Sequence, residues 1–257
     1  MRKTVLITGA SGGLGLEFAK IYAREGYDLV TVARNEGKLY KLKSELEAQY
    51  DCHIWVLTQD LSKPNAAYEV FNYTLEQNII IDALVNNAGF GDFGNFWEVD
   101  IQRQTDLLQV NIIALVQLTR YFLPGMVERG HGSVLNLSSV AAFSAGPRMC
   151  LYYASKEFVR SFSEAVAEEV RGTGVTVTAL CPGPTATGFE QAAQMKNSHM
   201  FSMFKPANAK AVAEAGFRAA QEGRVLCYYG LPTHAVNIGA RLLPRSVCRR
   251  FMKKVNG

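Results

Sequence analysis

The sequence has few of the residues that build metal centres and disulfide frameworks. Its five cysteines, Cys52, Cys150, Cys181, Cys227 and Cys248, are scattered, with no Cys-x-x-Cys pair, and its four histidines form no cluster. An odd number of widely separated cysteines is typical of reduced thiols in a cytosolic protein. We therefore expect a cytoplasmic protein without a metal site.

Long apolar runs, repeats and linkers are also missing. Apolar residues make up 48% of the 257 residues, and we find no run long enough to span a bilayer. The basic start followed by apolar Thr4–Ile7 resembles a signal peptide, but this stretch is too short and a glycine-rich segment follows at once. The length suits one α/β unit, so we expect residues 1–257 to form a single domain.

Acidic residues are absent from residues 224–257, where seven Lys and Arg residues give the chain its basic character. In this tail, about 241–257, apolar and basic residues fall on opposite helical stripes: Val247, Phe251 and Val255 against Arg245, Arg249, Arg250 and Lys253. Such a helix can lie on an anionic membrane, but we favour a helix packed on its own subunit or a partner with a solvated basic face. We expect no nucleic-acid binding, because the basic patch is one short helix without a known reader fold.

Short β-branched runs alternate with segments of helical periodicity along most of the chain. The expected strands are Thr4–Thr8, Asp28–Ala33, His53–Leu57, Ala83–Asn86, Ser133–Leu137, Thr176–Leu180 and Arg224–Tyr228. The expected helices are Gly13–Glu25, Asn35–Tyr50, Pro64–Gln77, Ile101–Glu128, Tyr152–Gly172 and Ala207–Glu222. This alternation predicts a doubly wound α/β Rossmann fold, with about seven mainly parallel strands, helices on both faces and ligands at the carboxyl ends of the strands.

A glycine-rich segment, Thr8–Gly15, joins the first expected strand to the first helix. Glycines there permit a tight turn and let the backbone approach a pyrophosphate, which then meets the positive end of the helix. The alternative is merely a sharp turn, but four glycines in seven positions favour a turn that binds pyrophosphate. After the second strand, where NAD enzymes usually present an acid, the chain has Arg34 and Asn35. We therefore prefer NADP(H) over NAD(H), although Arg34 is alternatively a solvated charge.

Tyr152 and Lys156 are four residues apart on an expected helix, so both can face one pocket. A nearby ammonium favours the phenolate and lowers a tyrosine pKa, which would suit Tyr152 to proton transfer. Ser139, thirteen residues earlier, follows an expected strand and can hold the same substrate oxygen. The spacing is common on exposed helices, so it carries weight only in context.

That context resembles the short-chain dehydrogenase/reductase superfamily, in its compact single-domain branch. The matching motifs occur in family order: Thr8-Gly9-x-x-x-Gly13-x-Gly15, Asp60, Asn86-Asn87-Ala88-Gly89, Asn111, Ser138-Ser139, Tyr152-x-x-x-Lys156 and Pro182-Gly183. The resemblance implies that Tyr152 is the general acid/base, that Lys156 binds the nicotinamide ribose and lowers the tyrosine pKa, and that Ser139 binds the substrate oxygen. It also implies that Asn111 holds a water linking Lys156 to solvent.

The resemblance further implies a set of coenzyme-binding residues, with Asp60 accepting from the adenine amine. This set is Gly9, Ser11, Gly13, Leu14, Gly15, Arg34, Asn35, Asp60, Leu61, Asn87, Ala88, Gly89, Tyr152, Lys156, Pro182, Gly183, Thr185 and Thr187.

Some assignments have local alternatives. Ser138 or Tyr153 could replace its neighbour, although only Ser139 and Tyr152 satisfy the family's spacing. Asn111 has an alternative as a structural residue whose amide is satisfied by backbone. Asp60 has one as the N-cap of the following helix.

The substrate side is expected to be apolar. A lid at about 184–206 contains Phe189, Met195, Met200, Phe201, Met203 and Phe204, and other loops bring Phe90, Phe93, Phe96 and Phe143 to the same rim. At least half of these side chains would instead serve packing in the lid or at a subunit contact.

These features predict an NADP(H)-dependent oxidoreductase that acts on a lipophilic secondary alcohol or ketone, with a hydroxysteroid as first choice and a 3-oxoacyl thioester as second. A non-catalytic NADPH-binding sensor or scaffold is the rival, and dehydratase or epimerase chemistry is a weaker one. The resemblance implies a homodimer or homotetramer formed through the helices that contain Asn111 and Tyr152.

Overall fold

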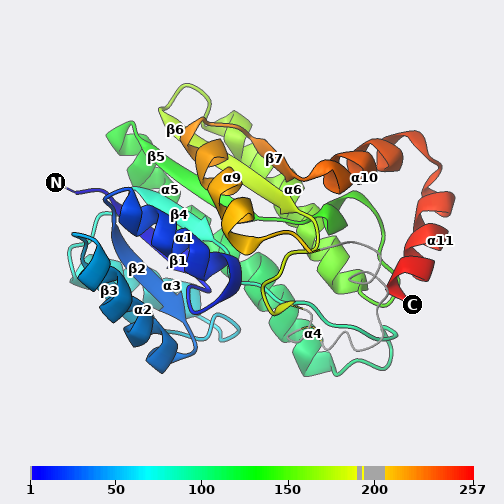
Figure 1. Cartoon of the computed structure of the whole chain (residues 1–257), viewed down its shortest axis with the longest axis horizontal. Coiled ribbons are helices and arrows are strands. Elements are labelled where there is room, and N and C mark those ends of the chain that lie inside the picture. The colour runs from blue at the N-terminus through cyan, green and yellow to red at the C-terminus, as the bar shows by residue number, and fades with distance from the viewer. Residues whose placement is uncertain (1, 190–192, 194–205) are drawn as a thin grey trace.

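The structure is a computed structural model that describes residues 2–189, 193 and 206–257. Seven strands form its sheet: β1 Thr4–Thr8, β2 Asp28–Ala33, β3 Ile54–Thr58, β4 Ala83–Asn86, β5 Gly132–Leu137, β6 Val175–Pro182 and β7 Leu226–Tyr229. They are ordered β3-β2-β1-β4-β5-β6-β7, and each neighbouring pair is parallel. The predicted doubly wound fold is confirmed (Figure 1).

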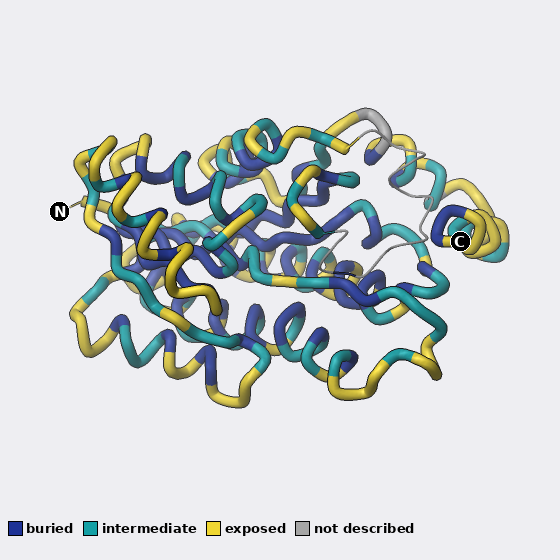
Figure 2. Tube along the Cα trace, turned by 60° about the horizontal axis from the view of Figure 1, so that its bottom comes forward, coloured by how far each residue is buried: buried dark blue, intermediate teal, exposed yellow. Residues whose placement is uncertain are grey.

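Helices cover both faces of this sheet. The described helical segments are α1 Gly13–Arg24, α2 Glu36–Gln49, α3 Ala66–Glu76, α4 Ile101–Leu108, η1 Gln109–Ala114, α5 Leu115–Arg129, η2 Val140–Phe143, α6 Cys150–Glu169, α9 Ala209–Gln221, α10 Leu231–Leu242 and α11 Arg245–Asn256. Helices α1, α2 and α9 pack on one face, and α3, α5 and α6 on the other. The strands are buried between them (Figure 2), which explains why they consist mainly of apolar and β-branched residues.

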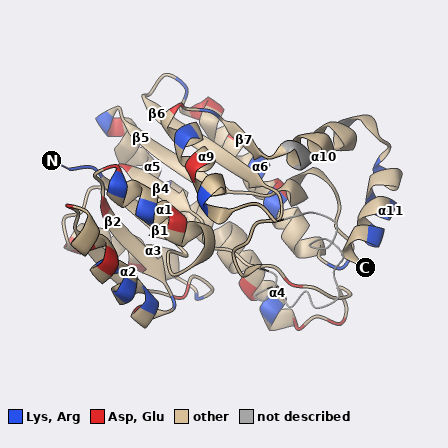
Figure 3. Cartoon of the chain, viewed as in Figure 1, with Lys and Arg blue, Asp and Glu red and all other residues tan. Residues whose placement is uncertain are grey.

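The expected strands match the observed ones to within two residues, but three helical features differ from expectation. The expected single helix over 101–128 contains a π-helical segment, η1, that includes Asn111. Helix α10 and the short helix η2 were not predicted, whereas the helix expected from Arg245 on within the tail at about 241–257 is observed as α11. Helix α11 carries Lys and Arg without an acid (Figure 3).

The segment Ile101–Arg129 is, against expectation, long and apolar enough to cross a membrane by length and composition alone. However, 44% of its most apolar 18-residue stretch is buried inside the fold. Leu118, Phe122 and Met126 pack in the core formed with the sheet and α3. We therefore interpret this segment as a core helix.

The strand order places the candidate site. Strand β1 lies between β2 and β4, so successive connections run outward in opposite directions from β1 and β4. In such sheets a crevice forms outside the carboxyl ends of the strands at this reversal. Thr8, Asn86 and Leu137 end β1, β4 and β5 there, beside the glycine turn that leads into α1.

Candidate active site

The turn after β1 is closed by short contacts that only glycine permits. A Cβ atom at Gly15 would lie 2.2 Å from the carbonyl oxygen of Gly9, and one at Gly9 would lie 2.8 Å from Nδ2 of Asn87. Gly9 also has a φ of +69°, in the left-handed region that favours glycine. The side chain of Asn87 also stabilises this turn, because its Nδ2 donates to the carbonyl of Thr8 at 2.8 Å.

Thr8 links the turn after β1 to the turn after β4, a role that the glycine motif does not predict. Its Oγ1 accepts hydrogen bonds from the backbone N–H groups of Asn87 at 3.0 Å and Ala88 at 2.9 Å. These hydrogen bonds therefore hold the turn after β1 and the turn after β4 together as one rigid unit.

The start of α1 fits the pyrophosphate of a dinucleotide. Its N-cap residue is Gly12, which has no side chain and so provides no cap for the first N–H groups of the helix. Gly9, Gly12, Gly13 and Leu14 line a cleft at this point. Uncapped N–H groups that open on a cleft attract an anion.

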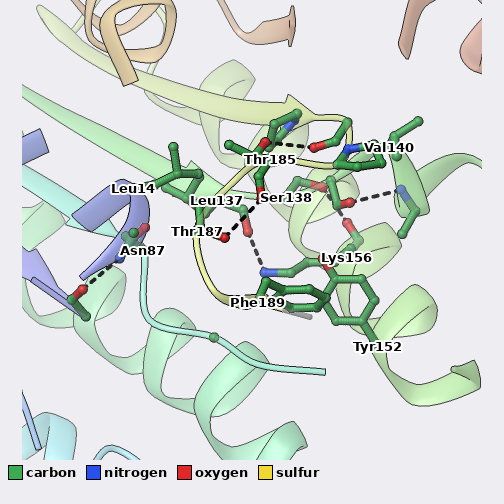
Figure 4. Close-up of a pocket in the computed structure, with 18 of the residues that line it drawn as sticks. Leu14, Asn87, Leu137, Ser138, Val140, Tyr152, Lys156, Thr185, Thr187 and Phe189 are labelled. Atoms are coloured by element: carbon green, nitrogen blue, oxygen red, sulfur yellow. Dashed lines mark hydrogen bonds between the residues drawn. The ribbon is translucent and has the colours of Figure 1, made fainter. Parts of the chain in front are cut away.

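Ser139, Tyr152 and Lys156 line the same cleft, Ser139 after β5 and the other two on α6. Figure 4 shows Tyr152 and Lys156 on that helix at the cleft. Ser139 follows β5 and starts η2, and its Oγ accepts from the N–H of Ala141 at 3.1 Å. Tyr152 and Lys156 lie one turn apart on α6, with Nζ of Lys156 5.8 Å from the centre of the Tyr152 ring. Nζ donates to the carbonyl of Leu137 at 2.8 Å, a partner that the sequence did not indicate.

Burial controls the protonation of this pair. Burial raises the pKa of Tyr152 to about 12, and a hydrogen bond with Ser139 opposes part of this rise. Burial also lowers the pKa of the Lys156 ammonium to about 8. The sequence predicts a lowered pKa for Tyr152, but desolvation dominates and the net pKa is raised, while the contribution of Lys156 to it stays a prediction. Tyr152 is a neutral phenol at pH 7 and can donate a proton.

The neighbouring residues have other partners. Oγ of Ser138 donates to the carbonyl of Lys156 at 2.7 Å and so ties β5 to α6. The hydroxyl of Tyr153 donates to Oδ1 of Asn256 in the C-terminal helix at 3.3 Å. These contacts favour Ser139 and Tyr152 over their neighbours for a role at the substrate.

The side chain of Asn111 is hydrogen-bonded to protein groups through both its oxygen and its nitrogen. Oδ1 accepts from the N–H of Phe90 at 3.0 Å, while Nδ2 donates to the carbonyl of Phe90 at 2.9 Å and to Oγ of Ser155 at 3.1 Å. This agrees with the structural alternative. Asn111 nevertheless lies near Lys156, since a Cβ atom at Gly89 would approach both Oδ1 of Asn111, at 3.0 Å, and Nζ of Lys156, at 3.3 Å.

The residues predicted to hold the adenosine lie at the ends of β2 and β3, outside the walls of the cleft. Arg34 is exposed, and Asn35 caps α2 by accepting from the N–H of Lys38 at 2.9 Å. Asp60 accepts from the N–H of Ser62 at 3.0 Å and is not the cap of α3, whose N-cap is Asn65, so the capping alternative is wrong. Leu61 is buried in the core.

The cleft has a volume of about 270 Å³. Predicted residues that line it are Gly9, Gly13, Leu14, Asn87, Ala88, Gly89, Ser139, Tyr152, Lys156, Pro182, Gly183, Thr185 and Thr187. Predicted residues outside this lining are Ser11, Gly15, Arg34, Asn35, Asp60, Leu61 and Asn111. Part of the predicted coenzyme set thus shares one cavity with Ser139, Tyr152 and Lys156, and the residues predicted to hold the adenosine do not line it.

Apolar residues line the cleft near Tyr152, but most of them are not the aromatic residues predicted for the substrate side. Of the expected aromatics, Phe189 lines the cleft and its ring lies 5.0 Å from that of Tyr152. Phe90, Phe93, Phe96 and Phe143 do not line it, and Phe96 is exposed. Val140, Ala141 and Met149 line it instead. Met195, Met200, Phe201, Met203 and Phe204 lie outside the described residues.

Comparison with known proteins identifies the family. Residues 3–198 match the family model described as short chain dehydrogenase. The chain is 34% identical over 185 residues to the uncharacterized oxidoreductase YvrD of Bacillus subtilis, covering 72% of this chain and 69% of that protein. It is 32% identical over 186 residues to a very-long-chain 3-oxoacyl-CoA reductase of Anas platyrhynchos, covering 71% of this chain but only 59% of the relative.

Comparison with solved structures supports the same family. A short-chain dehydrogenase from Sphingobium yanoikuyae in complex with NADPH matches with a TM-score of 0.83 and 28% identity, covering 93% of both chains. A 7beta-hydroxysteroid dehydrogenase matches with a TM-score of 0.87 and 25% identity, covering 97% of this chain and 96% of that one. The chain therefore belongs to the short-chain dehydrogenase family of oxidoreductases, which act on CH–OH and C=O groups.

Proposed function

We propose that this protein is an NADP(H)-dependent oxidoreductase for a lipophilic secondary alcohol or ketone. The observation that carries the proposal is the convergence of Ser139, Tyr152 and Lys156 on a cleft whose floor is the glycine turn. The bound coenzyme would supply or accept the hydride at its nicotinamide ring. The groups of this chain would hold the substrate oxygen and move its proton.

Tyr152 is the proposed general acid for reduction. With its pKa raised to about 12, it carries its proton at neutral pH and can donate it to an oxygen that gains negative charge. Ser139 would stabilise the same oxygen with its hydroxyl. Lys156 would bind the nicotinamide ribose, and Asn111 would link Lys156 to solvent through a water.

The preference for NADP(H) is supported by Arg34. This residue is exposed directly after β2, where no acid stands to bind the ribose hydroxyls. A guanidinium there pairs well with a 2′-phosphate. The remaining predicted contacts, Ser11, Asn35, Asp60 and Leu61, belong to the same proposal, and the NADPH-bound relative is consistent with it.

A hydroxysteroid or its ketone is our first choice of substrate. Met149, Val140, Ala141 and Phe189 give the cleft an apolar wall, and one structural relative is a hydroxysteroid dehydrogenase. Residues 184–206 would close over the substrate. A 3-oxoacyl thioester is the second candidate, favoured by the 3-oxoacyl-CoA reductases among the relatives.

We also propose a cytoplasmic homodimer or homotetramer. Helices α5 and α6 and the segment η1 would form its interface, since Val127, Phe158 and Ile113 on them are exposed. The five free cysteines are consistent with a reducing compartment.

The test follows NADPH oxidation with ketosteroids, 3-oxoacyl thioesters and small aldehydes, with NADH in parallel. We expect Tyr152→Phe to lower turnover by about 10² to 10⁴-fold, the usual contribution of a general acid, with NADPH affinity retained. Tyr153→Phe, which loses only the contact with Asn256, should lower it by less than about tenfold. Tight NADPH binding without turnover of any carbonyl would instead favour the sensor, and faster turnover with NADH would refute the coenzyme preference.

A further inference from the structure

The last two helices carry an exposed apolar surface that the site does not use. Five large apolar side chains form it, with exposed fractions between 47% and 78%; we call them the apolar ridge: Ile238, Leu242, Leu243, Val247 and Phe251. Ile238 and Leu242 are four residues apart along α10, and Val247 and Phe251 are four apart along α11, so each pair shares a helix face. Because these side chains are exposed and lie close together along the chain, we treat them as a candidate interaction surface.

The side of α11 that carries the ridge meets the fold toward the C-terminal end of the helix. Val255, which the sequence placed on the same stripe, is 2% exposed and Asn256 is fully buried. Nδ2 of Asn256 donates to the carbonyl of Pro147 at 2.8 Å. The end of α11 is therefore fixed to the body, while Val247 and Phe251 are still 47% and 54% exposed, with Phe251 also bordering a cavity against the body.

Cations border the ridge. The exposed cations of α11 are Arg245, Arg249, Arg250, Lys253 and Lys254. Arg250 follows Val247 by three residues and Lys254 follows Phe251 by three, so both lie beside the ridge. Residues 224–257 contain no acid that could neutralise them. Figure 3 shows this concentration on α11 at the edge of the molecule, away from the sheet.

We propose that the apolar ridge and the cations beside it bind the surface of an anionic lipid bilayer. Apolar side chains of such a helix enter the boundary between headgroups and acyl chains, while Lys and Arg attract lipid phosphates. A second copy fits less well. A two-fold contact brings the same patch of both subunits together, so the cations of two α11 helices would face each other without acids between them.

The position of this surface next to the catalytic cleft supports the proposal. Phe251, Met252 and Val255 of α11 line a small apolar cavity. Other walls of that cavity, including Tyr153 and Gly183, also line the cleft. The helix that would contact lipid thus lies beside the site where we propose that a lipophilic substrate binds. The proposal itself does not depend on that function, because vesicle binding needs neither coenzyme nor substrate.

The test is flotation of the full chain with phosphatidylcholine vesicles, with and without phosphatidylglycerol. We expect binding only to the anionic vesicles, and weaker binding at high salt. Arg250→Gln with Lys254→Gln should weaken it by roughly 25-fold, since each cation near such a surface contributes about fivefold. Leu242→Gln with Val247→Gln should weaken it by about tenfold or more through lost apolar insertion.

Matched controls change exposed residues on other helices. Lys38→Gln with Lys41→Gln removes two cations from α2, and Leu75→Gln removes an apolar side chain that is 57% exposed on α3. Both should bind like the native chain. The proposal is wrong if the native chain does not bind anionic vesicles, or if the ridge variants bind as well as the controls. It is also wrong if light scattering shows that the ridge variants dissociate a native dimer, because a second copy would then cover this surface.

Discussion

The two sides of the cleft, where we propose that the coenzyme and the substrate bind, are built in different ways; we call them the coenzyme side and the substrate side. The coenzyme side is closed mainly by backbone atoms of short motifs, as where Gly15 abuts the carbonyl of Gly9. The substrate side is closed by side chains from distant segments, as where Asn256 joins Tyr153, 103 residues away, to Pro147. A site made by the backbone leaves a compact glycine pattern in the sequence, whereas a site made by distant side chains leaves none.

The largest expected effect concerns the coenzyme side of the cleft, which is closed mainly by backbone atoms. In Gly15→Ala, the new Cβ would lie 2.2 Å from the carbonyl oxygen of Gly9 and 2.5 Å from Nδ2 of Asn87, so the turn has to move. We expect NADPH affinity to fall by about a hundredfold or more, because the N–H groups of α1 lose their position, and stability to fall by about 1–3 kcal/mol. Fluorescence titration and urea unfolding measure the two effects.

Gly12→Ala is the matched control for stability, since a Cβ at Gly12 meets no atom within 4 Å. It should unfold at nearly the native urea concentration. If Gly15→Ala is as stable as Gly12→Ala, the close approach at Gly15 does not hold the turn together, and the contrast between the two sides is lost.

The same contrast explains what could be predicted from the sequence. Strands β1 and β2 were predicted at their observed bounds because buried parallel strands are short apolar runs between helical segments. Tyr152 was separated from Tyr153 by its spacing from Lys156, a local property. The pKa of Tyr152 was mispredicted because it depends on burial by segments that only the fold brings together.

Features that depend on contacts between segments far apart in the sequence could not be predicted. The contact of Lys156 with the carbonyl of Leu137 joins α6 to β5, and no pattern marks a backbone acceptor. Nothing in the sequence distinguishes Asn256 from the other polar residues of the basic tail, yet Asn256 is fully buried. The π-helical turn around Asn111 accompanies side-chain contacts with Phe90 and Ser155, which come from other segments.

A second prediction concerns Lys156, which lies between the two sides. Its pKa is lowered from 10.5 to about 8, so between these pH values the unfolded chain binds a proton that the folded chain does not. Stability from this group therefore rises as pH increases from 8 to 10.5 and is lowest below pH 8, where the buried ammonium is charged. Lys156→Met removes this dependence.

Urea unfolding of both proteins at pH 7 and pH 10 isolates the effect, because the other titrating groups are common to both. The native chain should gain about 2–3 kcal/mol relative to Lys156→Met over this interval. An unchanged difference would mean that Lys156 keeps an ordinary pKa in the folded protein. The boundary between the two sides would then be more hydrated than its burial indicates.

The smallest expected effect concerns the substrate side of the cleft, which is closed by side chains from distant segments. Asn256→Ala leaves the hydroxyl of Tyr153 and the carbonyl of Pro147 without this partner, which should cost about 1–3 kcal/mol of unfolding free energy. Because Tyr153 and Met149 line the cleft, we expect KM for the carbonyl substrate to rise while NADPH affinity stays native. Urea unfolding, steady-state kinetics and coenzyme titration measure these three quantities.

Asn256→Asp separates the two hydrogen bonds of this residue. The carboxylate still accepts from Tyr153 but cannot donate to the carbonyl of Pro147, so a KM between those of the native chain and Asn256→Ala would show that both bonds position the cleft wall. If Asn256→Ala weakens NADPH binding as strongly as Gly15→Ala does, the tail supports the coenzyme side too. The two sides would then have to be treated as one cooperative unit, in which distant side chains and local backbone contribute to the same binding step.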